Sequence, residues 1–185
     1  IGDGREVLLT TPQRYDLILS EPSNPYRSGL ASFYSTDFYA GVKAHLNEGG
    51  SFGQWMQGYE VGADAVATVA ATLKSQFKEV TLWQLAPGDL LFIATDRHQT
   101  ADVAQLRAFL DAEPMKGAFR RLFVVTSVDE FLGLLVANQS LVDAVAATAD
   151  VINTDDNNAL EYMFARTVGR PGAALSVRHM LLLGA

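Results

Sequence analysis

The stretch that decides the fold is Tyr15-Asp16-Leu17-Ile18-Leu19-Ser20-Glu21-Pro22-Ser23-Asn24-Pro25. Its first six residues form a short apolar run that turn-forming residues follow, a pattern typical of a buried strand. Two prolines three positions apart exclude both a helix and a central strand over residues 21–25. We therefore expect a strand over residues 15–20 and an irregular loop at its carboxyl end.

Helix and strand patterns alternate downstream of this loop. Ser35 or Thr36 can cap a helix that we expect to end at Gly49-Gly50. The apolar face of this helix comprises Phe38, Tyr39, Val42 and Leu46. The elements expected next are a strand over 51–59, a helix over 62–77, and strands over 80–83 and 90–95. This order predicts an α/β fold that corresponds to the closing half of a doubly wound sheet.

The sequence pattern changes after Asp96. From there onward the periodicity favours helices, one of which begins with a capping box at Ser127 and Glu130. The three predicted helices span residues 101–111, 127–138 and 141–149. We therefore divide the chain into a partial α/β domain over residues 1–96 and a mostly helical C-terminal extension over residues 97–185.

Composition excludes several classes of function. Of the 185 residues, 49% are hydrophobic, which is ample for a buried core. The net charge of −7 lacks the basic footprint that a nucleic-acid binder needs. The chain has no cysteine, and its three histidines (His45, His98 and His179) share no metal-ligand spacing. With no long apolar run, the sequence predicts a soluble cytoplasmic protein without a metal site.

Glu21 stands where an open α/β sheet binds its ligands, which is beyond the carboxyl end of a strand. The prolines of its loop restrict the backbone and so hold the carboxylate in one direction. Such a group can accept a proton from an amine or hold an ammonium ion. A purely structural role in the turn is the alternative, and the position of Glu21 favours function.

Several stretches resemble the spermidine synthase family in their order and spacing. They are Asp3-Gly4-Arg5, Tyr15-Asp16-Leu17-Ile18, Glu21-Pro22-Ser23-Asn24-Pro25, Phe38-Tyr39, Leu46, Gly49-Gly50 and the strand with Gln54 and Gln57. The family consists of polyamine aminopropyltransferases, and the resemblance covers residues 1–96. Residues 153–156 and 160–162 are similar to the tail of bacterial spermidine synthase-like proteins, some of which are fused to membrane transporter segments. The resemblance implies the C-terminal half of a Rossmann-like fold of the S-adenosylmethionine-methyltransferase type.

The resemblance also implies roles for individual residues. Asp3, with Gly4, matches the motif that holds the adenine amino group. Glu21 matches the acid taken as the base for the attacking amine. Asn24 replaces a second acid that helps to hold the diamine, so a negative charge is lost there. Gln54 or Gln57 matches a substrate-side glutamine.

The function implied is aminopropyl transfer from decarboxylated S-adenosylmethionine to a small-molecule amine, with no permanently bound cofactor. An S-adenosylmethionine-dependent methyltransferase and a non-catalytic interaction domain are the alternatives. A homodimer and an upstream segment of the same polypeptide are the further partners that we consider. The family's Gly-rich nucleotide loop and ribose-binding acid have no counterpart in the sequence, so we expect them ahead of Ile1.

Overall fold

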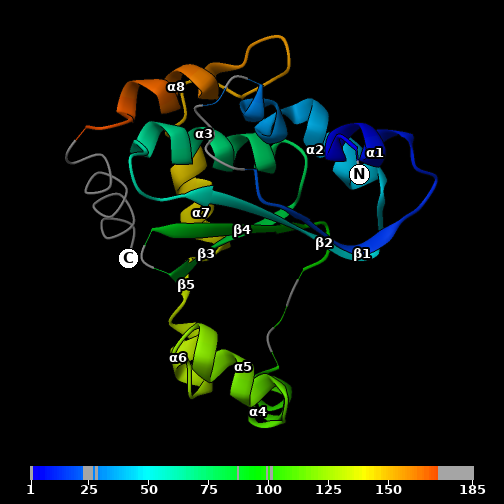
Figure 1. Cartoon of the computed structure of the whole chain (residues 1–185), viewed down its shortest axis with the longest axis vertical. Helices are drawn as coiled ribbons and strands as arrows, with labels where there is room; N and C mark the ends of the chain where they lie inside the picture. Colours follow the sequence, from blue (N-terminus) through cyan, green and yellow to red (C-terminus); the bar gives the residue numbers. More distant parts are fainter. Residues whose placement is uncertain are drawn as a thin grey trace.

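The chain folds around one five-stranded mixed sheet with the strand order β1-β2-β4-β3-β5 (Figure 1). The computed structural model describes residues 2–22, 27, 29–86, 88–98, 100 and 102–170. The strands are β1 (Tyr15–Ser20), β2 (Leu46–Gln57), β3 (Glu79–Ala86), β4 (Asp89–Thr95) and β5 (Leu135–Ala137). The pair β1–β2 is parallel, whereas β2–β4, β3–β4 and β3–β5 are antiparallel. The predicted α/β class is confirmed.

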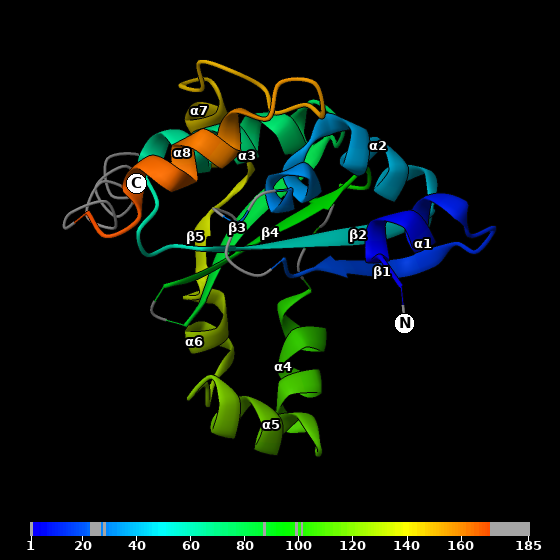
Figure 2. The ribbon, with the colours of Figure 1, turned by 45° about the horizontal axis from the view of Figure 1, so that its top comes forward.

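The helices divide between two sides of the sheet, as Figures 1 and 2 show. One side carries η1 (Leu30–Tyr34), α2 (Thr36–Ala44), α3 (Ala63–Lys74), α7 (Gln139–Ala146) and α8 (Ala159–Thr167). The short helix α1 (Gly4–Thr10) lies beside α2. On the other side, an arm projects that consists of α4 (Val103–Asp111), α5 (Met115–Leu122) and α6 (Val128–Leu132).

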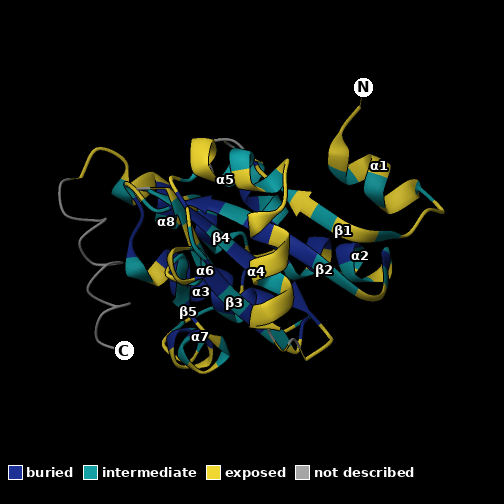
Figure 3. Ribbon diagram, turned by 90° about the horizontal axis from the view of Figure 1, so that it is seen from below, coloured by how far each residue is buried: buried dark blue, intermediate teal, exposed yellow. Residues whose placement is uncertain are grey.

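The main core lies between the sheet and the helices of the first side. Phe52 of β2 sits at its centre, fully buried, with ring centroids 5.5 Å from Tyr39, 6.2 Å from Phe38 and 6.1 Å from Phe77. Such aromatic pairs stabilise a core beyond the area that they bury. Figure 3 shows the contrast between the buried central strands and the exposed residues along α1, β1 and α4.

A strand over residues 15–20 is confirmed, but it is not the buried strand predicted, because none of its residues is buried and Leu17 and Leu19 are exposed. The helix from Ser35 is confirmed, but it does not end at Gly49-Gly50. Helix α2 ends at Ala44, and Leu46 already begins β2. The pairing of β1 with β2 jumps at this point, so that β2 holds extra residues opposite Asp16. Gly49-Gly50 form this bulge, and the φ of 75° at Gly49 favours glycine.

The last third of the chain contains a strand that the sequence pattern did not predict. The helix expected over 127–138 ends at Leu132, and residues 135–137 pair with β3 instead. Three residues are too short for an alternating pattern to be visible in the sequence. Helices α7 and α8 then pack on α3. Residues from β5 to α8 therefore share one sheet and one core with elements of residues 1–96.

Candidate functional site

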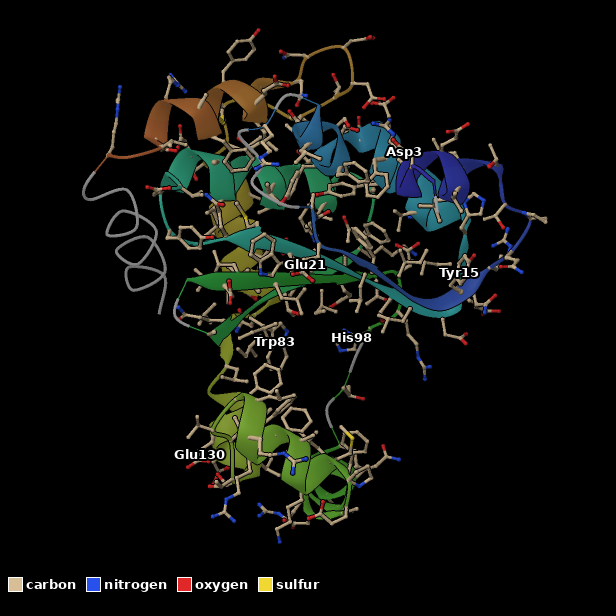
Figure 4. The ribbon with its side chains drawn as sticks, in the orientation of Figure 1. Asp3, Tyr15, Glu21, Trp83, His98 and Glu130 are labelled. Atoms are coloured by element: carbon tan, nitrogen blue, oxygen red, sulfur yellow. The ribbon has the colours of Figure 1, made fainter. Side chains whose placement is uncertain are left out.

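The candidate site lies at the carboxyl ends of β1 and β2. These two strands are parallel, and their pairing runs to the end of β1, where Ser20 pairs with Gln54 three residues before β2 ends. Glu21 follows Ser20 directly (Figure 4). It has no regular structure and is exposed, whereas Pro22 is buried. The irregular backbone predicted for residues 21 and 22 is confirmed. Asn24 and the rest of residues 23–26 lie outside the described residues.

The side chain of Gln54 links β2 to the last residue of β1, directly before Glu21. This side chain is fully buried, and its Nε2 donates hydrogen bonds to the carbonyl oxygens of Trp55 (3.0 Å) and Ser20 (3.4 Å). Because both neighbours of Nε2 are acceptors, the orientation of the amide is determined. The Oε1 atom has no hydrogen-bond partner among the described residues. A buried acceptor left in this way is costly unless a ligand or water completes it.

Gln57 lies on the same strand but does not join Gln54. Three positions apart on a regular stretch of β2, the two side chains point to opposite faces of the sheet. Gln57 is buried, its Nε2 donates to the carbonyl oxygen of Tyr59 (3.2 Å), and its Oε1 also lacks a partner among the described residues. Only Gln54 has a hydrogen bond to β1, immediately before Glu21.

A buried tyrosine completes the polar cluster around Gln54. The hydroxyl of Tyr34 donates to the carbonyl oxygen of Trp55 at 3.0 Å. Burial raises the pKa of Tyr34 well above its ordinary value, and the hydrogen bond with Gln54 opposes this only in part. Tyr34 therefore stays a neutral donor and supplies no negative charge to the site.

Asp3 has a local structural role. Its side chain is the N-cap of α1 and accepts hydrogen bonds from the backbone N–H groups of Arg5 (2.8 Å) and Glu6 (3.2 Å). Both Asp3 and Gly4 are exposed. Figure 4 shows Asp3 beside α1 and away from Glu21, so the described residues do not bring the two carboxylates into contact.

Asp155 and Asn153, which lie between α7 and α8, connect α1, η1 and the start of α2. The Asp155 carboxylate accepts a hydrogen bond from Ser35 Oγ at 2.6 Å and forms a salt bridge with Arg5. Its backbone N–H donates to Asp37 Oδ2 at 3.0 Å. Burial acts to raise the pKa of Asp155, but hydrogen bonds from Ser35 and Arg5 and the Arg5 charge outweigh it and lower the pKa.

Asn153, fully buried, makes the second set of contacts. Its Nδ2 donates to the Ala31 carbonyl oxygen, and its Oδ1 accepts from the Leu160 N–H, each at 3.1 Å. Its own N–H donates to Thr72 Oγ1 at 3.1 Å. The N-cap residue of α8, Asn158, makes no side-chain capping bond, so Asn153 supplies the acceptor for Leu160 in the first turn of that helix. No local pattern indicated the contacts with residues more than a hundred positions earlier.

In fold, the chain is similar to the crystal structure of a probable spermidine synthase from Corynebacterium glutamicum ATCC 13032. The TM-score is 0.52 and the sequence identity 16%, over 84% of this chain and 53% of that one. The chain therefore spans about half the length of the structure that it matches. In sequence, it matches no protein-family model and no curated protein.

The sheet topology and the structural comparison together define the fold class of the protein. The protein is a mixed α/β protein with a Rossmann-like, spermidine synthase-like fold. Within the part of the chain that the structure describes, no helix is long and apolar enough to span a bilayer. The same described residues contain no group of three or more potential metal ligands, and His179 lies outside them.

Replacing Gln54 tests how the site is held. Gln54→Met keeps the volume but removes the donor that the Ser20 and Trp55 carbonyl oxygens share. We expect the free energy of unfolding to fall by about 1–3 kcal/mol, because the Ser20 carbonyl oxygen loses this donor, although the Trp55 carbonyl oxygen keeps the Tyr34 hydroxyl. Urea denaturation measures this, and hydrogen exchange should become faster around Ser20. Unchanged stability would contradict the structural role of the Nε2 bonds.

The lowered pKa of Asp155 predicts a specific pH dependence of stability. Because the folded-state pKa lies below the ordinary value of about 3.9, ionised Asp155 stabilises the fold near neutral pH. This contribution is lost as the pH falls through the lowered pKa. We expect Asp155→Asn to be less stable than wild type at pH 7, with the difference narrowing toward pH 3. Urea midpoints over that range measure it, and a constant difference would contradict the assignment.

Proposed function

We propose that the protein takes part in spermidine synthase-like aminopropyl transfer from decarboxylated S-adenosylmethionine to a small-molecule amine. The observation that carries this proposal is Glu21, an exposed carboxylate at the carboxyl end of β1, directly after the residue that buried Gln54 holds. The carboxyl ends of parallel strands are where open α/β sheets bind ligands. The spermidine synthase-like fold supports the same reading.

The proposed reaction needs a base more than it needs an acid. The amine nitrogen attacks the carbon next to the sulfonium sulfur, the carbon–sulfur bond breaks, and its electron pair stays on sulfur. The leaving thioether, 5′-methylthioadenosine, is neutral and requires no proton. The attacking amine loses a proton, and Glu21 is the group that we propose to accept it. Positioned general bases and aligned reactants are the usual sources of rate in such a displacement.

The other residues receive binding roles in this proposal. Asp3 and Gly4 hold the adenine, and Asn24 together with Gln54 or Gln57 holds the amine. The Oε1 atom of Gln54 is a buried acceptor that the described residues leave unpaired, which suits an N–H donor of the substrate. The S-adenosyl compound is a co-substrate that leaves after each turnover. No nucleic acid takes part.

Glu21→Gln in the full-length protein tests the base. The amide keeps the shape but cannot accept the proton, so we expect the turnover rate to fall ~10²–10⁴-fold. The affinity for the donor should change little. Glu48→Gln is the matched control, because Glu48 is also exposed but lies near the start of β2, at the end of that strand opposite to the candidate site. Normal turnover by Glu21→Gln would show that the loop is structural.

The choice of donor separates this function from its alternatives. Product analysis with decarboxylated S-adenosylmethionine and with S-adenosylmethionine distinguishes aminopropyl transfer from methyl transfer. A full-length protein that binds neither compound would be a non-catalytic domain that retains the fold.

Asn24→Asp tests the amine as substrate. The substitution restores a negative charge at the position that in the resembling family helps to hold the diamine. We expect a lower KM for diamines and an unchanged KM for the donor, because a carboxylate pairs with the distal ammonium group. Steady-state kinetics with a diamine and with a monoamine of the same chain length measure it. An equal effect on both amines would mean that the acceptor is not a diamine.

A further inference from the structure

Asp3 lies in an early part of the chain, and the helix that it caps is tied through Arg5 to a segment near position 155. Arg5 follows Asp3 by two positions and points its guanidinium at two partners, the Ser32 carbonyl oxygen (3.2 Å) and the Asp155 carboxylate. Its guanidinium also lies 6.0 Å from the ring centroid of Phe38. Arg5 is thus held between η1, α2 and residue 155.

The same segment holds the chain where it returns from the Glu21 loop. Asn153 donates to the Ala31 carbonyl oxygen in η1, and the Thr36 N–H donates to the Asn153 carbonyl oxygen at 2.9 Å. Glu161 of α8 accepts a hydrogen bond from the Gly29 N–H at 3.5 Å. Contacts from residues 153–161 therefore reach α1 and the stretch of residues 29–36 that follows the Glu21 loop.

We propose that Asp155 is a positioning residue for the S-adenosyl donor, acting through its salt bridge with Arg5 and its hydrogen bond with Ser35. Asp155 sets the place of α1, and with it Asp3 at the N-cap of α1, relative to the N-terminus of α2. This inference rests on the proposed function, because it takes Asp3 as the group that holds the adenine.

The two contacts of the Asp155 carboxylate explain why a charged side chain is needed at position 155. The Asp155 carboxylate uses one oxygen for Ser35 and the other for Arg5, so a single side chain fixes two elements at once. Charge-assisted hydrogen bonds are stronger and more directional than neutral ones. A neutral amide at position 155 could still contact Ser35, but it would lose the ionic bond that keeps α1 in place.

The main test compares Asp155→Asn with wild type in the full-length protein. We expect KM for decarboxylated S-adenosylmethionine and Kd for 5′-methylthioadenosine to rise about tenfold, the loss of one charge-assisted hydrogen bond. The value of kcat at saturating donor should stay within about twofold, since Glu21 is untouched. Asp155→Glu, which keeps the carboxylate, should restore most of the affinity. This split between KM and kcat would not follow from a general loss of stability.

Asp156→Asn is the matched control, because Asp156 is exposed and no described contact involves its side chain. Arg5→Lys probes the pair from the other side, since lysine keeps the charge but lacks the planar guanidinium whose two nitrogens bond Ser32 and Asp155 separately. It should raise KM for the donor as Asp155→Asn does. If Asp155→Asn fails to fold, Arg5→Lys still decides. Unchanged donor KM and Kd in the folded variants, or an equal effect of Asp156→Asn, would overturn the proposal.

Hydrogen exchange keeps this test separate from that of the proposed function. Whether or not the protein turns over, loss of the Asp155–Arg5 bond should speed exchange at the amides of residues 4–10, relative to those of α3. If wild type neither turns over nor binds 5′-methylthioadenosine, the donor role of Asp155 fails together with the proposed function. If wild type binds and exchange in residues 4–10 is unchanged by Asp155→Asn, the positioning role alone is wrong.

Discussion

The parallel pairing of β1 with β2 is the constraint on which the rest of the structure depends. A parallel pair cannot be joined by a tight turn, so the chain must leave the sheet and return across one face. Helix α2 fills that connection, and Phe38 and Tyr39 pack on Phe52 of β2. The same geometry brings the carboxyl ends of β1 and β2 to one edge, which places Glu21 beside the strand that carries Gln54.

The part of the chain that follows the sheet supplies constraints that the βαβ unit cannot supply itself. Asn153 is fully buried and satisfies backbone groups of η1 and α8, where an unpaired carbonyl or N–H would be costly. Asp155 adds a charged link to α1 and to the cap of α2. Residues 153–155 are therefore not an accessory to the fold, because they fix α1, η1 and the N-terminus of α2.

Much of the sheet could be predicted because its signals are local. The strand β1, the Ser35 cap and the period of α3 each depend on neighbours within a few residues, and all three elements are confirmed. The burial predicted for β1 is wrong, because Leu17 and Leu19 are exposed. The helix end predicted at Gly49-Gly50 is wrong because glycine is typical of both helix ends and β-bulges. Only the pairing of β2 with β1 distinguishes the two. Strand β5 and the Asp155–Arg5 pair depend on contacts distant in sequence, for which a single sequence has no pattern.

The same reasoning explains which part of the site could be anticipated. The place of Glu21 directly after a strand is a property of the topology, and the sequence pattern predicts it. Whether Gln54 or Gln57 bonds the last residue of β1 depends on the register between β1 and β2. A shift of one residue would exchange the faces of the sheet to which the two side chains point. The structure sets Gln54 against Ser20, so a buried amide, whose Oε1 has no partner among the described residues, contacts the residue directly before Glu21.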